Sequence, residues 1–279
     1  MLAHNMTQAI VLDKSYLDGA STQAVRTLCE RYMVLVSDEL FYELLTTRRE
    51  SQTRCFSKLP NTPNPVTLIP NVGSLLRYEM ENQSACTPVH RHKIQETFQF
   101  NEQLRQGTYE FEGETRDHLE EWKKTIAEDT NSFIARWEVV HQFFPELNGI
   151  EYKTLPTAVE GARIKIAKDE DFVREIYASF LDADAPANSP PAAMIFPEWA
   201  FYRWVQCQVL TSLRLFGRHQ GRPPDTPGKE FLKKAEHSML DTYHLIHGVL
   251  VGAMATRDTE IQQDLLLLLP DSVIVGLTE

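Results

Sequence analysis

The chain has few cysteines and no long apolar segment. Its four cysteines show no paired spacing of the kind found in a disulfide framework or a zinc site. This usage is typical of a reduced, cytoplasmic protein with structural thiols. The longest apolar runs fall short of the roughly 18 residues needed to cross a membrane. The opening residues, MLAHNMTQ, lack a basic region followed by an apolar stretch. We therefore expect neither a signal peptide nor a membrane partner.

Positive charge is also scarce. Lysine and arginine number 28 against 39 acidic residues, which gives a formal net charge of −11. This balance argues against a broad basic surface that coats nucleic acid without specificity. It still permits a local basic groove. The same balance results when a protein gathers several carboxylates around a metal ion.

Short apolar runs at both ends of the chain predict a parallel sheet. Residues 10–12, 32–37 and 66–69 form such runs, and segments with helical spacing separate them. An alternation of strand and helix is the sign of a parallel sheet. The same alternation returns in residues 229–279. There we expect a helix through about Gly248, a strand near Met254, a helix over 259–268 and a last strand over 272–275.

The middle of the chain has a different character. Helical patterns dominate from about residue 75 to residue 228, and Pro- and Gly-rich breakers interrupt them at 183–191 and 217–228. We therefore predict an α/β fold whose sheet is built from residues 1–74 and 229–279. Residues 75–228 are predicted to be a mostly helical insertion.

Two apolar strands, one near each end of the chain, are each followed by an aspartate. Asp13 follows the run at 10–12, and Asp258 follows the run that ends near Thr256. In an open α/β sheet, ligands bind just outside the carboxyl ends of the strands. The two aspartates are therefore candidates for one shared site.

Two further acidic residues are candidates for the same site. Glu43 lies on the helix expected after the second strand, four residues after Glu39, and Asp241 lies on the helix that leads to the last strands. Two carboxylates 4 Å apart would repel each other by about 4 kcal/mol at an effective dielectric constant near 20. Hard oxygen ligands of this kind are what Mg²⁺ or Mn²⁺ requires. Two such ions can hold a phosphodiester and activate a water.

Four sequence segments around these residues resemble the motifs of PIN domains. IVLDKSYL resembles the first motif, with a serine two residues after the aspartate. VLVSDELFYELL resembles the second, LDTYHLIHGVLVGAMATRD the third and fourth, and LPDSVIV the closing strand. The resemblance covers roughly residues 8–70 and 229–279. The insertion of some 150 residues is much larger than in the compact members of that family.

The resemblance implies a nuclease with a Rossmann-like parallel sheet and a divalent-metal site. By position, Asp13, Glu43, Asp241 and Asp258 would be the catalytic ligands of one or two Mg²⁺ or Mn²⁺ ions. Ser15 would hold a phosphate or orient a carboxylate, and Thr256 would play a similar part. The implied reaction is hydrolysis of a phosphodiester, with RNA favoured over DNA as the substrate.

The basic residues that would contact the nucleic acid are less clearly marked. Arg214, Arg218 and Arg222 lie in the most basic local stretch, which leads into the third motif. Arg48 and Arg49 follow Glu43 and are a second candidate. A solvated charged face is the ordinary explanation for both groups.

Structural explanations also exist for the acidic residues. Asp13 alone would be explained as a strand-end cap or the start of an Asx-turn, but its three partners in order favour the metal site. Asp258 has the alternative of the N-cap of the next helix, a role compatible with metal binding. Glu43 and Asp241 have the alternative of exposed helix positions. Glu39 and Asp18 are alternative ligands, but a surface position is favoured for each. His90 and His92 have a spacing that can bind zinc, but no matching partners lie nearby, so a loop is favoured.

Two other functions remain open from the sequence. One is a catalytically degenerate scaffold of the same fold that acts as a binding or regulatory module, with the helical insertion as its surface for a protein partner or a second copy. The other is a DNA-cleaving defence effector of the same superfamily.

Overall fold

The computed structural model describes residues 8–62, 64–91, 102–110, 112–151, 153–184, 186–220 and 228–276. Five strands form one sheet in the order β3-β2-β1-β4-β5, and each neighbouring pair is parallel. The predicted α/β fold with a parallel sheet is therefore confirmed. The strands are β1 (Ala9–Leu12), β2 (Met33–Ser37), β3 (Thr67–Ile69), β4 (Ala253–Ala255) and β5 (Val273–Val275).

The central strands are apolar because both of their faces are covered. Ile10, Val11 and Leu12 of β1 are each at most 1% exposed, as is Leu35 of β2. A strand buried on both faces has no reason to alternate polar and apolar residues, so it reads as a continuous apolar run. This explains why apolar runs in the sequence predict β1 and β2.

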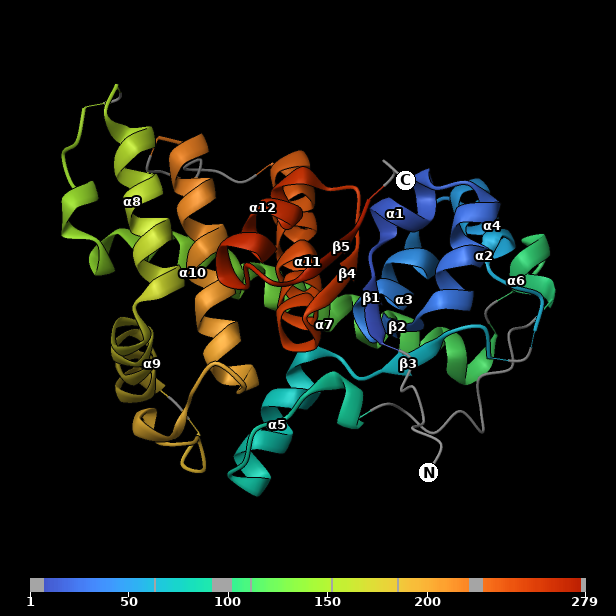
Figure 1. The fold of residues 1–279 in the computed structure, drawn as a ribbon, viewed down its shortest axis with the longest axis horizontal. Coiled ribbons are helices and arrows are strands. Elements are labelled where there is room, and N and C mark those ends of the chain that lie inside the picture. Colours follow the sequence, from blue (N-terminus) through green and yellow to red (C-terminus); the bar gives the residue numbers. More distant parts are fainter. Residues whose placement is uncertain are drawn as a thin grey trace. The chain divides into compact units, whose positions relative to one another are not determined.

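One face of the sheet is covered by the helices that follow β1 and β2. Side chains of Ile10, Val34 and Ala253 share a buried cluster on this face with Leu17, Leu28 and other helix residues. Figure 1 shows α1, α2 and α4 together on one side of β1 and β2. These helices are α1 (Lys14–Gly19), α2 (Thr22–Arg31), α3 (Asp38–Thr46) and α4 (Arg49–Lys58).

The other face meets the end of a long helix from the C-terminal part of the chain. This helix, α11 (Lys229–Val251), leads into β4, and α12 (Thr259–Leu268) connects β4 to β5. A Cβ on Gly248 would lie 3.0 Å from the Met254 sulfur, so the glycine permits a close approach of helix and strand. The helix runs three residues beyond the predicted end at Gly248. Gly252, with φ of +79°, then turns the chain into β4.

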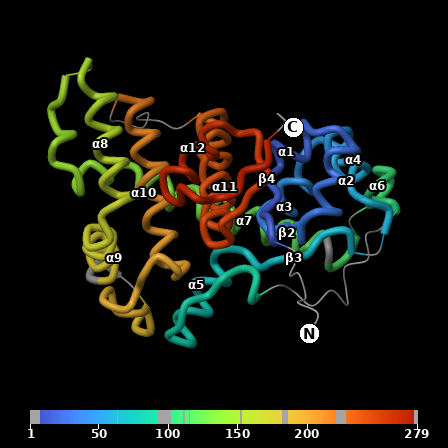
Figure 2. The backbone as a smooth tube through the Cα atoms, in the orientation of Figure 1, coloured from blue at the N-terminus to red at the C-terminus, as the bar shows by residue number. Residues whose placement is uncertain are grey.

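Strands from the two ends of the chain are neighbours in the sheet. Leu12 of β1 pairs with Ala255 of β4, and the blue and red segments of the tube run side by side at this point (Figure 2). The sheet is thus completed only when residues more than 240 positions apart meet.

The chain divides into two compact units. The first contains the sheet and comprises Met1–Leu75, Thr87–Leu119 and His247–Glu279, whereas the second comprises Leu76–Cys86 and Glu120–Ile246. The boundary after Leu75 lies one residue from the predicted boundary after residue 74, and residue 228 falls inside the second unit. The first unit also holds α6 (Glu102–Gln106) and the 3₁₀ turn Pro88–Arg91.

The second unit is helical in its described residues. In it α10 packs against α8 and α9, and the middle of α10 is almost fully buried. None of the described helices combines the length and the apolar character needed to cross a bilayer. The remaining elements are α5 (Val72–Asn82), α7 (Gly113–Val139), α8 (Leu155–Lys168), α9 (Glu170–Asp184), α10 (Ala200–Arg218) and the 3₁₀ turns Val140–Phe143, Pro145–Leu147 and Ala192–Met194.

Candidate functional site

The strand order places a topological switch point between β1 and β4. The chain moves from β1 to β2 on one side and from β4 to β5 on the other. The connecting segments therefore separate just beyond the carboxyl ends of β1 and β4, where open α/β sheets bind ligands. Asp13 follows β1 directly, and Thr256 to Asp258 follow β4.

Asp13 is buried at this point and held by two hydroxyl groups. It is 3% exposed, and its backbone N–H extends the pairing of β1 with β4 by donating to the Ala255 carbonyl at 3.0 Å. Its Oδ2 accepts hydrogen bonds from Ser15 Oγ and, at 2.7 Å, from Thr256 Oγ1. Sequence segments from both ends of the chain thus meet on one carboxylate oxygen.

The two hydroxyls are themselves fixed by the backbone after β4. Ser15 Oγ accepts the Arg257 N–H at 2.9 Å, and Thr256 Oγ1 accepts the Asp258 N–H at 3.1 Å. Both hydroxyls lie within hydrogen-bond distance of Asp13 Oδ2, and their oxygens are 3.2 Å apart. The Oδ1 atom of Asp13 has no hydrogen-bond partner among the described residues.

Asp258 lies at the start of α12 and caps it. Its Oδ1 accepts the backbone N–H groups of Glu260 at 2.8 Å and Ile261 at 3.1 Å. The capping role expected as one alternative is therefore present. The second oxygen, Oδ2, takes no part in the cap. Through Thr256, Asp258 belongs to the same hydrogen-bond network as Asp13.

Glu43 lies in the first unit and is 8% exposed, which excludes the solvated position considered as its alternative. Its Oε1 forms an ion pair with Lys14 Nζ at 3.6 Å. Lys14 directly follows Asp13, so the pair lies close to the end of β1. The lysine supplies a positive charge at the position where the sequence predicts a metal ion.

The expectation that Glu39 is a surface residue is wrong. It is 2% exposed, its Oε1 accepts the Val72 N–H at 2.7 Å, and its Oε2 lies 3.3 Å from His247 Nε2. Burial alone would raise the pKa of Glu39, but the nearby His247 and the Val72 N–H outweigh it and hold the pKa below its usual value. The sequence signal for this pair was a histidine within an apolar run.

Asp241 is the one predicted ligand that lies in the second unit. It is a partly exposed residue of α11, whereas Asp13, Glu43 and Asp258 belong to the first unit. Within the described ranges, no three His, Cys, Asp or Glu side chains are grouped so that they could hold one metal ion. A centre of four carboxylates therefore stays a prediction.

The predicted basic residues are dispersed. Arg48 is the exposed N-cap of α4, and Arg49 donates from Nε to the Gly107 carbonyl. Arg214 and Arg218 lie on α10 in the second unit, and Arg222 lies outside the described residues. His90 lies in the turn Pro88–Arg91 with its Nδ1 3.0 Å from Thr87 Oγ1, and its zinc-type partner His92 lies outside the described residues.

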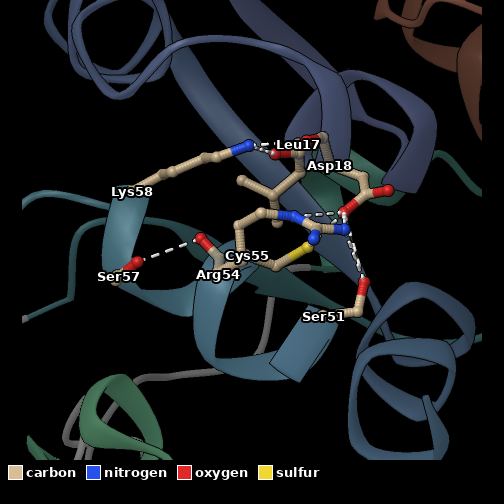
Figure 3. A network of polar contacts seen from close by, with 7 residues as sticks. All are labelled: Leu17, Asp18, Ser51, Arg54, Cys55, Ser57 and Lys58. Atoms are coloured by element: carbon tan, nitrogen blue, oxygen red, sulfur yellow. Dashed lines mark hydrogen bonds and ion pairs between the residues drawn. The ribbon is translucent and has the colours of Figure 1, made fainter. Parts of the chain in front are cut away.

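A polar network that the sequence did not reveal holds α1 against α4. Lys58 Nζ donates to the carbonyls of Leu17 at 2.8 Å and Asp18 at 2.6 Å, at the end of α1 (Figure 3). Asp18 is also paired with Arg54 and accepts from Ser51 at 3.2 Å. Slight burial raises the pKa of Asp18, but the donors outweigh it and leave the pKa below its usual value. The network fixes the helix that carries Ser15.

Arg257 is a second feature that the sequence reasoning missed. It is exposed, and its side chain lies over Gly19, where a Cβ atom would overlap the guanidinium group. Its backbone is anchored at Ser15. Arg257 is the middle residue of Thr256–Arg257–Asp258 in the sequence. The position of its side chain depends on where α1 lies, which the sequence does not show.

Comparisons with protein-family models, with curated proteins and with solved structures find no match to this chain. The assignment to the PIN domains accordingly stays a prediction from its sequence motifs.

Proposed function

We propose that the chain is a Mg²⁺- or Mn²⁺-dependent nuclease of the PIN-like type that hydrolyses phosphodiester bonds, with RNA favoured over DNA. The observation that supports this most is Asp13. It is a buried carboxylate at the switch point of a parallel sheet, with one oxygen held by Ser15 and Thr256 and the other without a partner among the described residues.

The residues at this point are chemically suited to a divalent cation. Asp13 has no ion pair with a basic side chain in the described part of the chain, and an isolated buried charge is costly. Asp13 Oδ1 and Asp258 Oδ2 are hard oxygen ligands. Within the first unit they would hold the ion together with Glu43. When bound, the ion supplies a water activated for attack and a positive charge beside the phosphate.

The remaining residues orient this carboxylate set. Ser15 and Thr256 fix the Asp13 carboxylate by donating to Oδ2, which directs Oδ1 away from the network. The cap interactions fix Asp258 Oδ1 in the same way and leave Oδ2 available. Lys14 holds Glu43 and adds a positive charge that favours an approaching phosphate.

The test is cleavage of a labelled single-stranded RNA in the presence of Mn²⁺. We expect Asp13→Asn to lower the rate by about a hundred-fold or more, the usual effect of removing one electrostatic contact at a reacting centre. Asp271→Asn is the matched control, because Asp271 is exposed and precedes β5, which places it toward the opposite edge of the sheet. Cleavage by the Asp13→Asn protein at the wild-type rate would exclude the proposal.

The same cleavage assay tests whether the substrate is RNA or DNA. Single-stranded RNA and DNA of one sequence differ by the 2′-hydroxyl, which a protein can read. Faster cleavage of the DNA would replace the RNA proposal with that of a DNA-cleaving effector.

One observation favours a second candidate, a non-catalytic binding module on the same scaffold. Lys14 pairs with Glu43, so this carboxylate already has a cation. A module without an ion site should show no rise in melting temperature as Mn²⁺ is added. A protein with a site is stabilised by RT ln(1 + [L]/Kd).

A further inference from the structure

A groove lies beside the Asp13 network, between α2 and the end of β5. Its volume is about 390 Å³, and it is open on one side. Side chains of α2 and of its C-cap residue form one wall, and Tyr16 of α1 and the end of β5 form the other. The lining of the groove includes Tyr16, Gln23, Thr27, Arg31, Tyr32 and Val275.

The groove follows from the strand order. Val273 and Val275 of the edge strand β5 pack against the same cluster as Ala253 and Ala255 of β4, so they face the side of the sheet that carries α2. However, α2 packs over β2, on the far side of β1 from β5. This offset leaves room beside β5 on that face.

One end of the groove lies beside the candidate site. Tyr16 directly follows Ser15, whose hydroxyl donates to Asp13. On the other wall, the Val275 carbonyl accepts the Thr256 N–H at 3.2 Å, and Thr256 is the second donor to Asp13. The groove then follows α2 to Arg31 and Tyr32, which precede β2 and so lie toward the amino ends of the strands, away from Asp13. A strand that reaches Asp13 can enter the groove from its near end.

The groove carries side chains that suit a nucleotide. Arg31 is exposed and has no acidic partner among the described residues, although the protein has a net charge of −11. The ring of Tyr32 lines the groove, and its hydroxyl has no hydrogen-bond partner in the described part of the chain. Gln23 adds an amide group and Thr27 a hydroxyl group, and Gln23 Nε2 lies 3.4 Å from Thr27 Oγ1. A cation, an aromatic ring and polar groups are the components of single-strand recognition.

We propose that this groove binds one unpaired nucleotide of the strand that is cut at Asp13. The inference rests on the proposed nuclease function and names a subsite for its substrate. Tyr32 offers its ring to the base, Arg31 binds a phosphate, and Gln23 and Thr27 contact polar edges of the nucleotide. The volume falls within the range of about 300–1,000 Å³ that is usual for sites of small ligands.

The test compares variants that differ only in whether they line the groove. Arg31→Gln and Arg26→Gln each remove one exposed positive charge from α2, but only Arg31 lines the groove. Tyr32→Leu and Tyr109→Leu each remove a ring that packs against the same core cluster, but only Tyr32 lines the groove. Affinity for a labelled ten-nucleotide RNA is measured by fluorescence anisotropy in EDTA at one fixed salt concentration.

We expect Arg31→Gln and Tyr32→Leu to weaken RNA binding by about five-fold or more, the effect of losing one stacking or phosphate contact. Arg26→Gln and Tyr109→Leu should stay near the wild-type affinity. With Mn²⁺ present, the groove variants should raise KM for RNA and leave hydrolysis of bis(4-nitrophenyl) phosphate unchanged, because that small diester does not reach the groove.

The outcomes separate this inference from the nuclease proposal. If the wild type cleaves RNA and the groove variants bind and cleave like their controls, the subsite is wrong and the nuclease proposal stands. If the wild type cleaves neither substrate but Arg31→Gln and Tyr32→Leu still lose RNA affinity, the nuclease proposal is wrong and the subsite stands. Equal or equally absent binding in all five proteins overturns the subsite.

Discussion

Asp13 depends on two hydroxyl groups that are very far apart in the sequence. Ser15 lies two residues away, whereas Thr256 lies 243 residues away. Both are also acceptors for backbone N–H groups, so each hydroxyl links the carboxylate to the segment after β4. The position of the carboxylate is therefore set by hydrogen bonds rather than by packing alone.

Replacing Thr256 with valine tests this dependence. Valine keeps the shape but removes the hydroxyl, so Asp13 loses one donor and the Asp258 N–H loses its acceptor. We expect the free energy of unfolding to fall by about 1–3 kcal/mol, the cost of unsatisfied buried groups. Urea denaturation measures it. Thr256→Ser keeps the hydroxyl and should recover most of the loss; if serine is as damaging as valine, the methyl group is the important part.

Gly19→Ala tests the placement of the Arg257 side chain. A Cβ on Gly19 would overlap the end of a flexible side chain, and Gly19 has no positive φ, so the arginine can move aside. We expect the free energy of unfolding to change by less than about 1 kcal/mol. The measurement is again urea denaturation, with Arg257→Ala as the control. A larger loss in Gly19→Ala alone would show that the guanidinium is held firmly in place.

At the scale of elements, α12 and the candidate site share Asp258. The residue caps the helix through Oδ1 and leaves Oδ2 unused by the cap. Capping needs a hydrogen-bond acceptor, whereas cation binding needs charge. The two roles can therefore be separated by substitution.

Asp258→Asn should keep the cap, because asparagine and aspartate are comparable at N-cap positions. Asp258→Ala should lose it and lower the free energy of unfolding by about 1 kcal/mol. We expect both variants to lose Mn²⁺-dependent cleavage. Thermal denaturation and the RNA assay provide the two readouts. Full activity in Asp258→Asn would restrict Asp258 to its structural role.

The elements that the sequence predicted well are those whose signal is local. The apolar runs at 10–12 and 66–69 became β1 and β3, and the segment with helical spacing between the first two runs contains α2, which Ser21 caps. The short helix α1 was not predicted. Six residues are too few for a periodic pattern, and its end is held by Lys58, which lies 40 positions farther along the chain.

In the candidate site, too, only the contacts that have a local sequence signal could be predicted. The meeting of Asp13, Ser15 and Thr256 follows from strand ends and parallel topology, both of which leave marks in the sequence. The burial of Glu39 does not, because its partner His247 is 208 residues away and no local pattern reports it. The groove beside Arg31 also depends on how far α2 lies from an edge strand, which is a property of packing.

At the scale of the whole molecule, the second unit has its own buried carboxylate. Glu79 is fully buried and accepts the N–H groups of Cys86 at 2.8 Å, Ala200 at 2.7 Å and Phe201 at 2.9 Å. It thereby joins α5 to the start of α10. Burial raises the pKa of Glu79 to about 7, although the three donors act in the opposite direction.

This shift predicts a pH dependence of stability. Because the pKa of Glu79 is higher in the folded state, its protonated form is favoured by folding. The contribution is complete below about pH 4.5 and is lost as the pH rises through about 7, with a size on the order of 3 kcal/mol. Glu79→Gln should flatten the dependence between pH 5 and 8. Urea denaturation at several pH values checks this, and identical slopes for both proteins would refute it.

The pairing of β1 with β4 has a consequence for protein synthesis. A ribosome adds roughly 5–20 residues per second, so about ten seconds or more separate the emergence of β1 from that of β4. During that time Asp13 has been made, but Thr256 and Asp258 do not yet exist. A growing chain, still attached to its own messenger RNA, therefore carries only half of the Asp13 hydrogen-bond network until its last strands are translated.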